Sequence, residues 1–195
     1  KIELHEKTGK YNYENGEYIR PSEEELKLTS TVVEDKGVDM DLVKEGKYLN
    51  PGDKYVKEVK VKNIGTKKAY IRVQLTPEWI APESGWPIDS KTNEAFKPDN
   101  QLVNYPILSD WELIEQPKEE LWYYYTKIVE PNESTTELIK EVIFPGREMT
   151  NEYQDAGFTL KVKAEAIQAS NDAIKDEWKI DPSTWKEIEE PGTTP

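Results

Sequence analysis

The sequence predicts an all-β protein, an antiparallel β-sandwich of jelly-roll type with a long connection rich in proline and tryptophan and one or two short helices. Three observations indicate this class. Several segments alternate apolar and polar residues with period two, as in strands that bury one face and expose the other. Residues that favour turns separate these segments. Strands and helices do not alternate along the chain, as they would around a parallel sheet.

The clearest alternation lies in residues 51–75. Its first half alternates the apolar Val59 and Val61 with charged residues. Its second half carries an apolar row at Ala69, Ile71, Val73 and Leu75. Residues 63–68, Asn-Ile-Gly-Thr-Lys-Lys, separate the halves and favour a turn. We therefore expect two strands joined as an antiparallel hairpin.

Shorter segments show the same pattern elsewhere in the chain. Further strands are expected at residues 26–33, at Val38, Met40 and Leu42, and at residues 111–114, 121–129, 138–144 and 158–166. A short helix is expected within residues 169–179, capped by Ser170 or Asn171, with Trp178 turned inward.

These elements predict one domain with two looser ends. Residues 1–25 are polar with sparse aliphatic residues, and predict an N-terminal tail or a donor strand. Residues 26–185 carry the strand patterns and predict the jelly-roll domain. Residues 186–195 predict a linker-like C-terminal tail.

Residues 76–110 contain five prolines, which remove the backbone donors that a sheet needs. We expect a long connection there. Trp79, Trp86 and Trp111 lie in it or directly after it. Two interpretations stay open: the indole rings form a platform on which a ligand stacks, or they are buried and cover one end of the sandwich.

The chain is acidic, with 39 acidic and 26 basic residues and a net charge of −13. This charge repels nucleic acids and anionic lipids, and no apolar run is long enough to span a membrane. We expect neither nucleic-acid binding nor membrane insertion. The absence of cysteine suits an exported bacterial protein and a cytosolic protein equally. The first residue is not methionine, so we expect a targeting segment upstream of it.

The residues needed for most enzymatic mechanisms are missing. His5 is the only histidine, and Gly9 stands where a zinc-protease motif needs a second one. No nucleophile elbow, phosphate-binding loop or dinucleotide fingerprint occurs. We expect no catalytic residues, no cofactor and no metal site, although a calcium site at Asp39 and Asp41, or among Asp172, Asp176 and Glu177, stays open.

Three motifs resemble the family of TasA, CalY and camelysin, which are Gram-positive proteins exported with a SipW-type signal peptidase. The first is Pro51-Gly52 followed by residues 59–66, VKVKNIGT, and 69–73, AYIRV. The second is residues 122–125, WYYY, with the turn and strand after them. The third is residues 164–169, AEAIQA.

The resemblance implies a secreted jelly-roll subunit of a biofilm-matrix fibre. In this family an N-terminal strand of one subunit completes the sheet of the next. The implied partners are copies of the same chain and other matrix components.

We therefore expect residues 1–20 to be an exchangeable strand that is needed for assembly and dispensable for folding. Its anchors are Ile2, Leu4, Tyr11, Tyr13 and Ile19. A disordered tail is the alternative. The alternative function is a cell-surface module that binds carbohydrate or protein through exposed aromatic residues.

Overall fold

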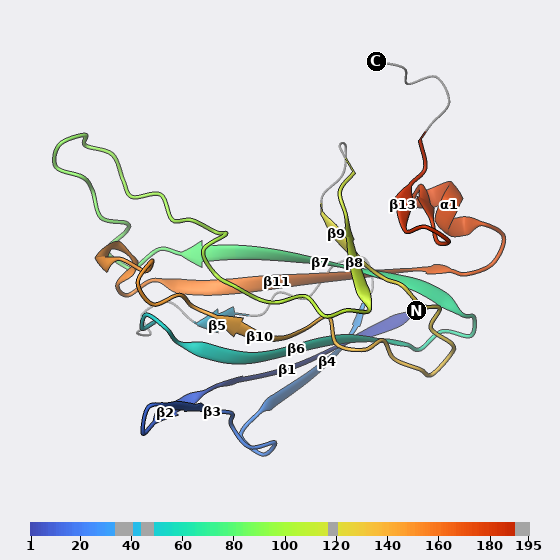
Figure 1. Ribbon diagram of the computed structural model, residues 1–195, viewed down its shortest axis with the longest axis horizontal. Coiled ribbons are helices and arrows are strands. Elements are labelled where there is room, and N and C mark those ends of the chain that lie inside the picture. The colour runs from blue at the N-terminus through green and yellow to red at the C-terminus, as the bar shows by residue number, and fades with distance from the viewer. Residues whose placement is uncertain (34–40, 44–48, 117–120, 190–195) are drawn as a thin grey trace.

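The computed structural model describes residues 1–33, 49–116 and 121–189, and the backbone of residues 41–43. Two antiparallel sheets pack face to face (Figure 1). Sheet I consists, in spatial order, of β10 (Ile139–Ile143), β6 (Lys54–Asn63), β1 (Ile2–Lys10) and β4 (Lys27–Val33). Sheet II consists of β5 (Asp41–Val43), β11 (Gly157–Gln168), β7 (Ala69–Ile80), β9 (Trp122–Tyr125) and β8 (Trp111–Ile114).

The architecture confirms the predicted all-β sandwich. Consecutive strands from β4 to β7 alternate between the two sheets, as in a double-sheet jelly roll. The short elements are β2 (Asn12–Glu14), β3 (Glu17–Ile19), η1 (Asn151–Tyr153), α1 (Ala173–Glu177), β12 (Ile180–Asp181) and β13 (Lys186–Glu187). Strands expected at residues 111–114, 138–144 and 158–166 are present within a few residues of their predicted bounds. Val38 and Met40 lie outside the described residues.

The hairpin predicted within residues 51–75 is wrong. β6 pairs with β1 and β10 in sheet I, whereas β7 pairs with β11 and β9 in sheet II. The connection therefore crosses the sandwich. An alternating row shows that a strand has one buried face, but two strands on opposite sides of one core have the same pattern as two strands in one sheet.

Asn63 holds this crossing together with its buried side chain. Its Nδ2 donates to the carbonyl oxygens of Lys67 and Val129, at 2.8 and 2.9 Å, and its Oδ1 accepts from the backbone N–H of Gly65 at 2.9 Å. Buried amides that satisfy several backbone groups fix a turn strongly, because an unpaired buried group is costly. Asn63 lies in the first of the motifs described above.

The main core fills the space between the sheets. Its centre is aromatic, with Trp79, Phe144 and Phe158 in edge-to-face contact at ring separations of 5.1–6.0 Å. A second, smaller cluster lies on the outer face of sheet II, where Ile174, Trp178 and Ile180 cover Trp122 and other residues. Trp178 is thus turned inward, as predicted.

Two boundaries differ from those predicted. β7 continues through Pro77 to Ile80, with Pro77 opposite Leu160 on β11. The predicted C-terminal tail begins with β13, which pairs with β12, so Lys186 and Glu187 belong to a small folded unit. Residues 190–195 lie outside the described part.

One ion pair is buried between the sheets. Lys57 on β6 is fully buried, and its Nζ lies 3.2 Å from Oε1 of Glu6 on β1. The same ammonium donates to the carbonyl oxygen of Leu160 on β11, at 3.1 Å. The alternation of buried and outward residues along β6 is interrupted here, because Val56 is buried as well as its neighbour Lys57. At the same place the register between β6 and β10 shifts, between Ile139 and Glu141. The pair therefore links two strands of sheet I to the facing sheet.

We predict that Lys57→Met destabilises the fold by about 3–5 kcal/mol, because it leaves the Glu6 carboxylate buried without its cation. Adding Glu6→Leu should recover most of this loss, since the pair is then replaced by apolar side chains of similar size. Free energies of unfolding from urea titrations test both variants. Lys60→Met, on the outward row of the same strand, is the matched control. A double variant no more stable than Lys57→Met would contradict the prediction.

Candidate assembly interface

The five predicted anchors of the N-terminal segment divide into two groups. Ile2 and Leu4 are buried on β1 and belong to the main core. Tyr13 and Ile19 are exposed on the hairpin of β2 and β3, and Tyr11 precedes that hairpin with its ring 4.7 Å from Nζ of Lys54. The structure does not bring the five residues together on one surface.

β1 is an internal strand of this chain. It pairs along its length with β6 on one side and with β4 on the other. Ile2, Leu4 and Glu6 form its inward row. The segment Ile2–Lys10 is therefore part of the sandwich, and the effect expected from deleting it is reversed: its removal takes away core side chains and separates β4 from β6. Whether β1 is exchanged between copies stays a prediction.

The segment that joins β1 to β4 is longer than its task requires. Neighbouring antiparallel strands can be joined by two residues, but residues 11–26 separate Lys10 from Lys27. β2 and β3 fold part of this length into a hairpin around Asn15 and Gly16, both at positive φ. The hairpin exposes Tyr13 and Tyr18, whose rings lie 4.9 Å apart.

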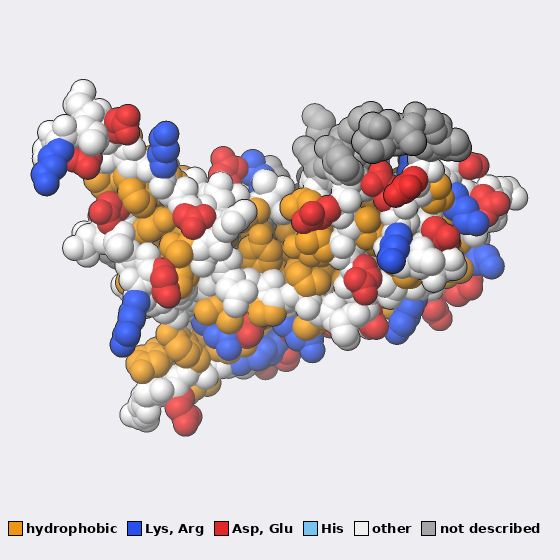
Figure 2. All heavy atoms as spheres, turned by 45° about the horizontal axis from the view of Figure 1, so that its top comes forward, with side chains coloured by type: hydrophobic (Ala, Val, Ile, Leu, Met, Phe, Trp, Pro, Cys, Tyr) orange, Lys and Arg blue, Asp and Glu red, His pale blue; other side chains and the backbone are white. Residues whose placement is uncertain are grey.

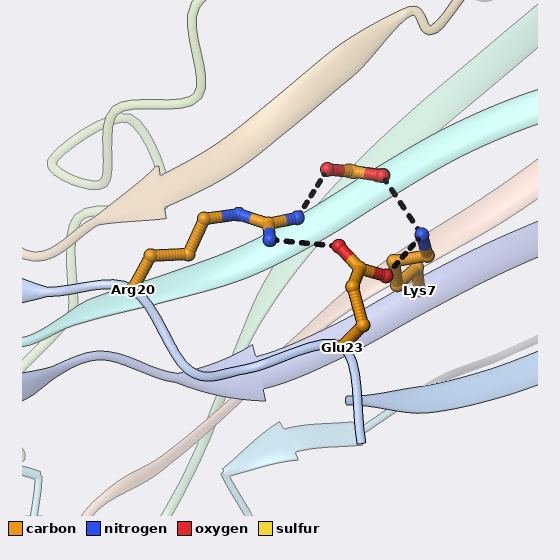
Figure 3. A network of polar contacts seen from close by, with 4 residues as sticks. Lys7, Arg20 and Glu23 are labelled. Atoms are coloured by element: carbon orange, nitrogen blue, oxygen red, sulfur yellow. Dashed lines mark hydrogen bonds and ion pairs between the residues drawn. The ribbon is translucent and has the colours of Figure 1, made fainter. Parts of the chain in front are cut away.

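Charged side chains fasten this segment to the outer face of sheet I (Figure 3). The Glu23 carboxylate accepts from Lys7 Nζ at 2.8 Å and from Arg20 Nη1 at 3.0 Å. Glu58 on β6 accepts from Arg20 Nη2 at 2.7 Å and lies 3.9 Å from Lys7. We call Lys7, Arg20, Glu23 and Glu58 the clamp. Its hydrogen bonds from Lys7, and then from Arg20, hold the pKa of Glu23 below its ordinary value.

β4 forms an open edge of sheet I. β1 pairs with one side of it, and no strand among the described residues pairs with the other. Leu28 and Val32 are 69% and 40% exposed on its outward row. Residues 28–33, LTSTVV, contain no charge, proline or glycine, although a third of the whole chain is charged. Such a segment on an open edge readily accepts another strand.

The opposite edge of sheet I is occupied. Asn104 and Ile143 exchange backbone hydrogen bonds of 3.0 and 2.7 Å, and Leu108 donates to the carbonyl of Leu138 at 3.0 Å. The connection after β7 therefore covers β10. In sheet II, β8 is only four residues long and carries the exposed Glu112. β4 is thus the edge of sheet I that no described strand or connection covers.

The predicted ligand platform is not formed by the three tryptophans. Trp79 and Trp111 are buried in the main core, so neither indole face is free to stack on a ligand. Trp86 is half-buried against Phe96 and Tyr153, at ring separations of 5.8 and 6.4 Å. These aromatic residues anchor the base of the connection, which extends beyond the end of the sandwich (Figure 1). The indole rings of Trp79 and Trp111 are buried because removing such a large apolar surface from water stabilises the fold.

The surface carries both signs of charge. Figure 2 shows acidic and basic side chains interspersed with apolar ones over one face. Within the described residues no cluster of three or more histidine, cysteine, aspartate or glutamate side chains could hold a metal ion. Asp39 of the possible calcium site lies outside them. No described helix is long and apolar enough to cross a membrane.

Sequence reasoning missed two features of this interface. The open edge had a signal, because residues 28–33 are the charge-free part of a highly charged N-terminal region. The burial of Glu6 and Lys57 had none, because both resemble the outward residues of a half-buried strand.

No family model, curated protein or solved structure matches this chain.

We predict that the clamp weakens in acid. A carboxylate with a lowered folded-state pKa stabilises the fold above its unfolded pKa, and this contribution is lost as the pH falls through the folded value. Lys7→Met should raise the pKa of Glu23 towards its ordinary value of 4.5 and reduce the acid-dependent loss of stability. Carboxyl NMR titration and urea unfolding at several pH values measure the two effects. Lys27→Met is the control, and equal pKa values in the two variants would contradict the clamp.

Proposed function

We propose that the protein is a structural subunit of an extracellular biofilm-matrix fibre, assembled by strand donation between subunits. In this proposal β1 of one subunit occupies the place between β6 and β4 of the next. The observation that carries it is the combination of an internal first strand with a connection far longer than its two neighbouring strands need. We expect no catalytic activity.

The energetics of β1 favour exchange between copies of the same chain. Its contacts with β6, β4 and the core are the same whether it comes from the same subunit or from another, so exchange costs little energy once it has occurred. Ile2 and Leu4 fill apolar positions, and Glu6 meets Lys57. A strand displaced by two residues would place Glu6 elsewhere in the core, so the buried pair favours one register.

The connection supplies the reach that donation requires. An extended chain covers about 3.3 Å per residue, so residues 11–26 could span roughly 50 Å if the hairpin and the clamp opened. In the closed subunit this length is folded into β2 and β3 and held by Arg20 and Glu23. The clamp would therefore oppose exchange, and its exposed ion pairs would weaken at high salt.

The extracellular location is supported by the motifs that resemble the TasA, CalY and camelysin family. Pro51 and Gly52 precede β6, Asn63 fixes the crossing to β7, and residues 164–168 lie on β11. The motifs thus fall on the strands and turns that define the sandwich. The high net charge suits a subunit that must stay soluble before it assembles.

Locking β1 to its own subunit tests strand donation. His5 and Lys60 are direct cross-strand partners on the outward face of sheet I. Opposed residues in antiparallel strands lie about 4.5–5.5 Å apart at Cα, which suits a disulfide. His5→Cys with Lys60→Cys, oxidised as a monomer, should form no fibres in electron micrographs, and reduction should restore assembly.

The chain has no cysteine of its own, so every disulfide must involve the introduced thiols, and non-reducing electrophoresis separates the bond within one chain from bonds between chains. The single variants His5→Cys and Lys60→Cys are the controls and should assemble under both conditions. Fibres formed by the fully oxidised double variant would overturn donation of β1. A wild-type chain that stays monomeric across concentration, pH and salt would overturn the fibre itself.

A further inference from the structure

We infer that the open edge of β4 is a second, two-fold interface at which two copies of this chain pair antiparallel through residues 28–32. The inference rests on the proposed function only in that both require self-association, because it involves neither exchange of β1 nor opening of the clamp. Figure 1 shows β4 at the outer boundary of sheet I, beyond β1.

The open edge of β4 is uncharged over residues 28–32. Leu28, Ser30 and Val32 form the outward row, opposite Lys7, His5 and Glu3 of β1 in that order. Thr29 and Thr31 form the inward row and are only half-buried. Proteins usually protect open edges with charge, proline or a bulge. Residues 28–32 have none of these, and no described strand pairs with their outward backbone donors and acceptors, which lie beside the β-branched Thr29, Thr31 and Val32.

Residues 28–32 are complementary to a second copy of themselves. Residues directly opposite each other in an antiparallel pair have side chains on the same face of the sheet. If a two-fold axis passes through Ser30, then Leu28 of each copy lies opposite Val32 of the other, and Thr29 lies opposite Thr31. This is the only register that pairs the two exposed apolar side chains with each other. Apolar and threonine pairs of this kind stabilise a sheet.

The surface beside the β4 edge is hollowed. His5, Leu28 and Ser30 help to line a hollow on the outward face of sheet I. Two of these lining residues contact each other, with Ser30 Oγ 3.5 Å from Nδ1 of His5. Val32 of the second copy would lie next to Leu28 at this hollow. The paired edges would join two four-stranded sheets into one continuous antiparallel sheet.

Such an interface is isologous, so it closes on itself and yields a dimer. A fibre built through β1 would then carry one open β4 edge on every subunit. Pairing through β4 would join two subunits or two fibres side by side. This role differs from that of β1, which would link subunits in series.

Single cysteines test the register, because the native chain has none. Ser30→Cys places the two introduced thiols on the axis, about 4.5–5.5 Å apart at Cα, within disulfide range. Leu28→Cys places them four residues apart along the paired strands, about 14 Å, which is too far. Under mild oxidation of the monomeric protein, Ser30→Cys should form a covalent dimer, while Leu28→Cys and the exposed control Ser183→Cys should not.

Charge substitutions test the same register without a covalent bond. Leu28→Lys with Val32→Lys puts like charges opposite each other and should abolish the dimer in sedimentation velocity. Leu28→Glu with Val32→Lys puts opposite charges together in both halves of the interface and should retain it. Ile88→Lys, at an equally exposed apolar residue away from β4, is the control and should dimerise like the wild type.

The outcomes separate this inference from the proposed function. Equal cross-linking of Ser30→Cys and Leu28→Cys, or a dimer that survives the two lysine substitutions, would overturn the β4 interface even if fibres form. Two results together would support β4 pairing, whether or not β1 is donated. The first is cross-linking of Ser30→Cys but not of Leu28→Cys, and the second is a normal dimer of the oxidised double variant His5→Cys with Lys60→Cys. Circular dichroism of each variant establishes that it is folded.

Discussion

The buried ion pair between Glu6 and Lys57 is the constraint on which the arrangement of this sandwich depends. Lys57 reaches from β6 to Glu6 on β1 and to the carbonyl of Leu160 on β11, so one ammonium connects both sheets. Two charges in an apolar core stabilise a fold less than apolar side chains of equal volume, but separating them is costly. The pair therefore contributes more to fixing the position of β1 between β6 and β4 than to stability. Any strand that occupies this place must supply a carboxylate where Glu6 lies, at the third residue of the inward row.

This constraint explains how an internal strand could also be exchangeable. Apolar residues such as Ile2 and Leu4 would tolerate a shifted register, since one aliphatic side chain can replace another in a core with modest loss. A buried carboxylate does not, because its partner is fixed on β6. The long connection and the clamp act on a different quantity, the ease with which β1 leaves its place. Glu6 thus determines the register in which β1 pairs, whereas the connection and the clamp determine how easily β1 leaves its place.

The two edges of sheet I are treated differently. Backbone hydrogen bonds from Asn104 and Leu108 cover β10. In β4, by contrast, residues 28–33 carry no charge, and no described strand pairs with the outer side. An unprotected edge in a soluble protein is a liability unless the sheet continues into another molecule. On the face in Figure 2 acidic and basic side chains are interspersed with apolar ones, and mixed charge of this kind limits nonspecific contacts.

The sequence by itself determined the class of the fold and most of its strands, because the alternation of residues such as Ile71 and Val73 reports directly which side of a strand is buried. Only the tertiary structure decided which strands are neighbours. β6 and β7 were predicted as a hairpin and lie in opposite sheets, since alternation carries no information about pairing partners. The same limit applies to the candidate site. The polar composition of residues 1–25 predicted a tail or a donor strand, yet β1 is an internal strand of its own chain. Composition could not show this, because a carboxylate such as Glu6 is buried only when a distant residue, here Lys57, neutralises it.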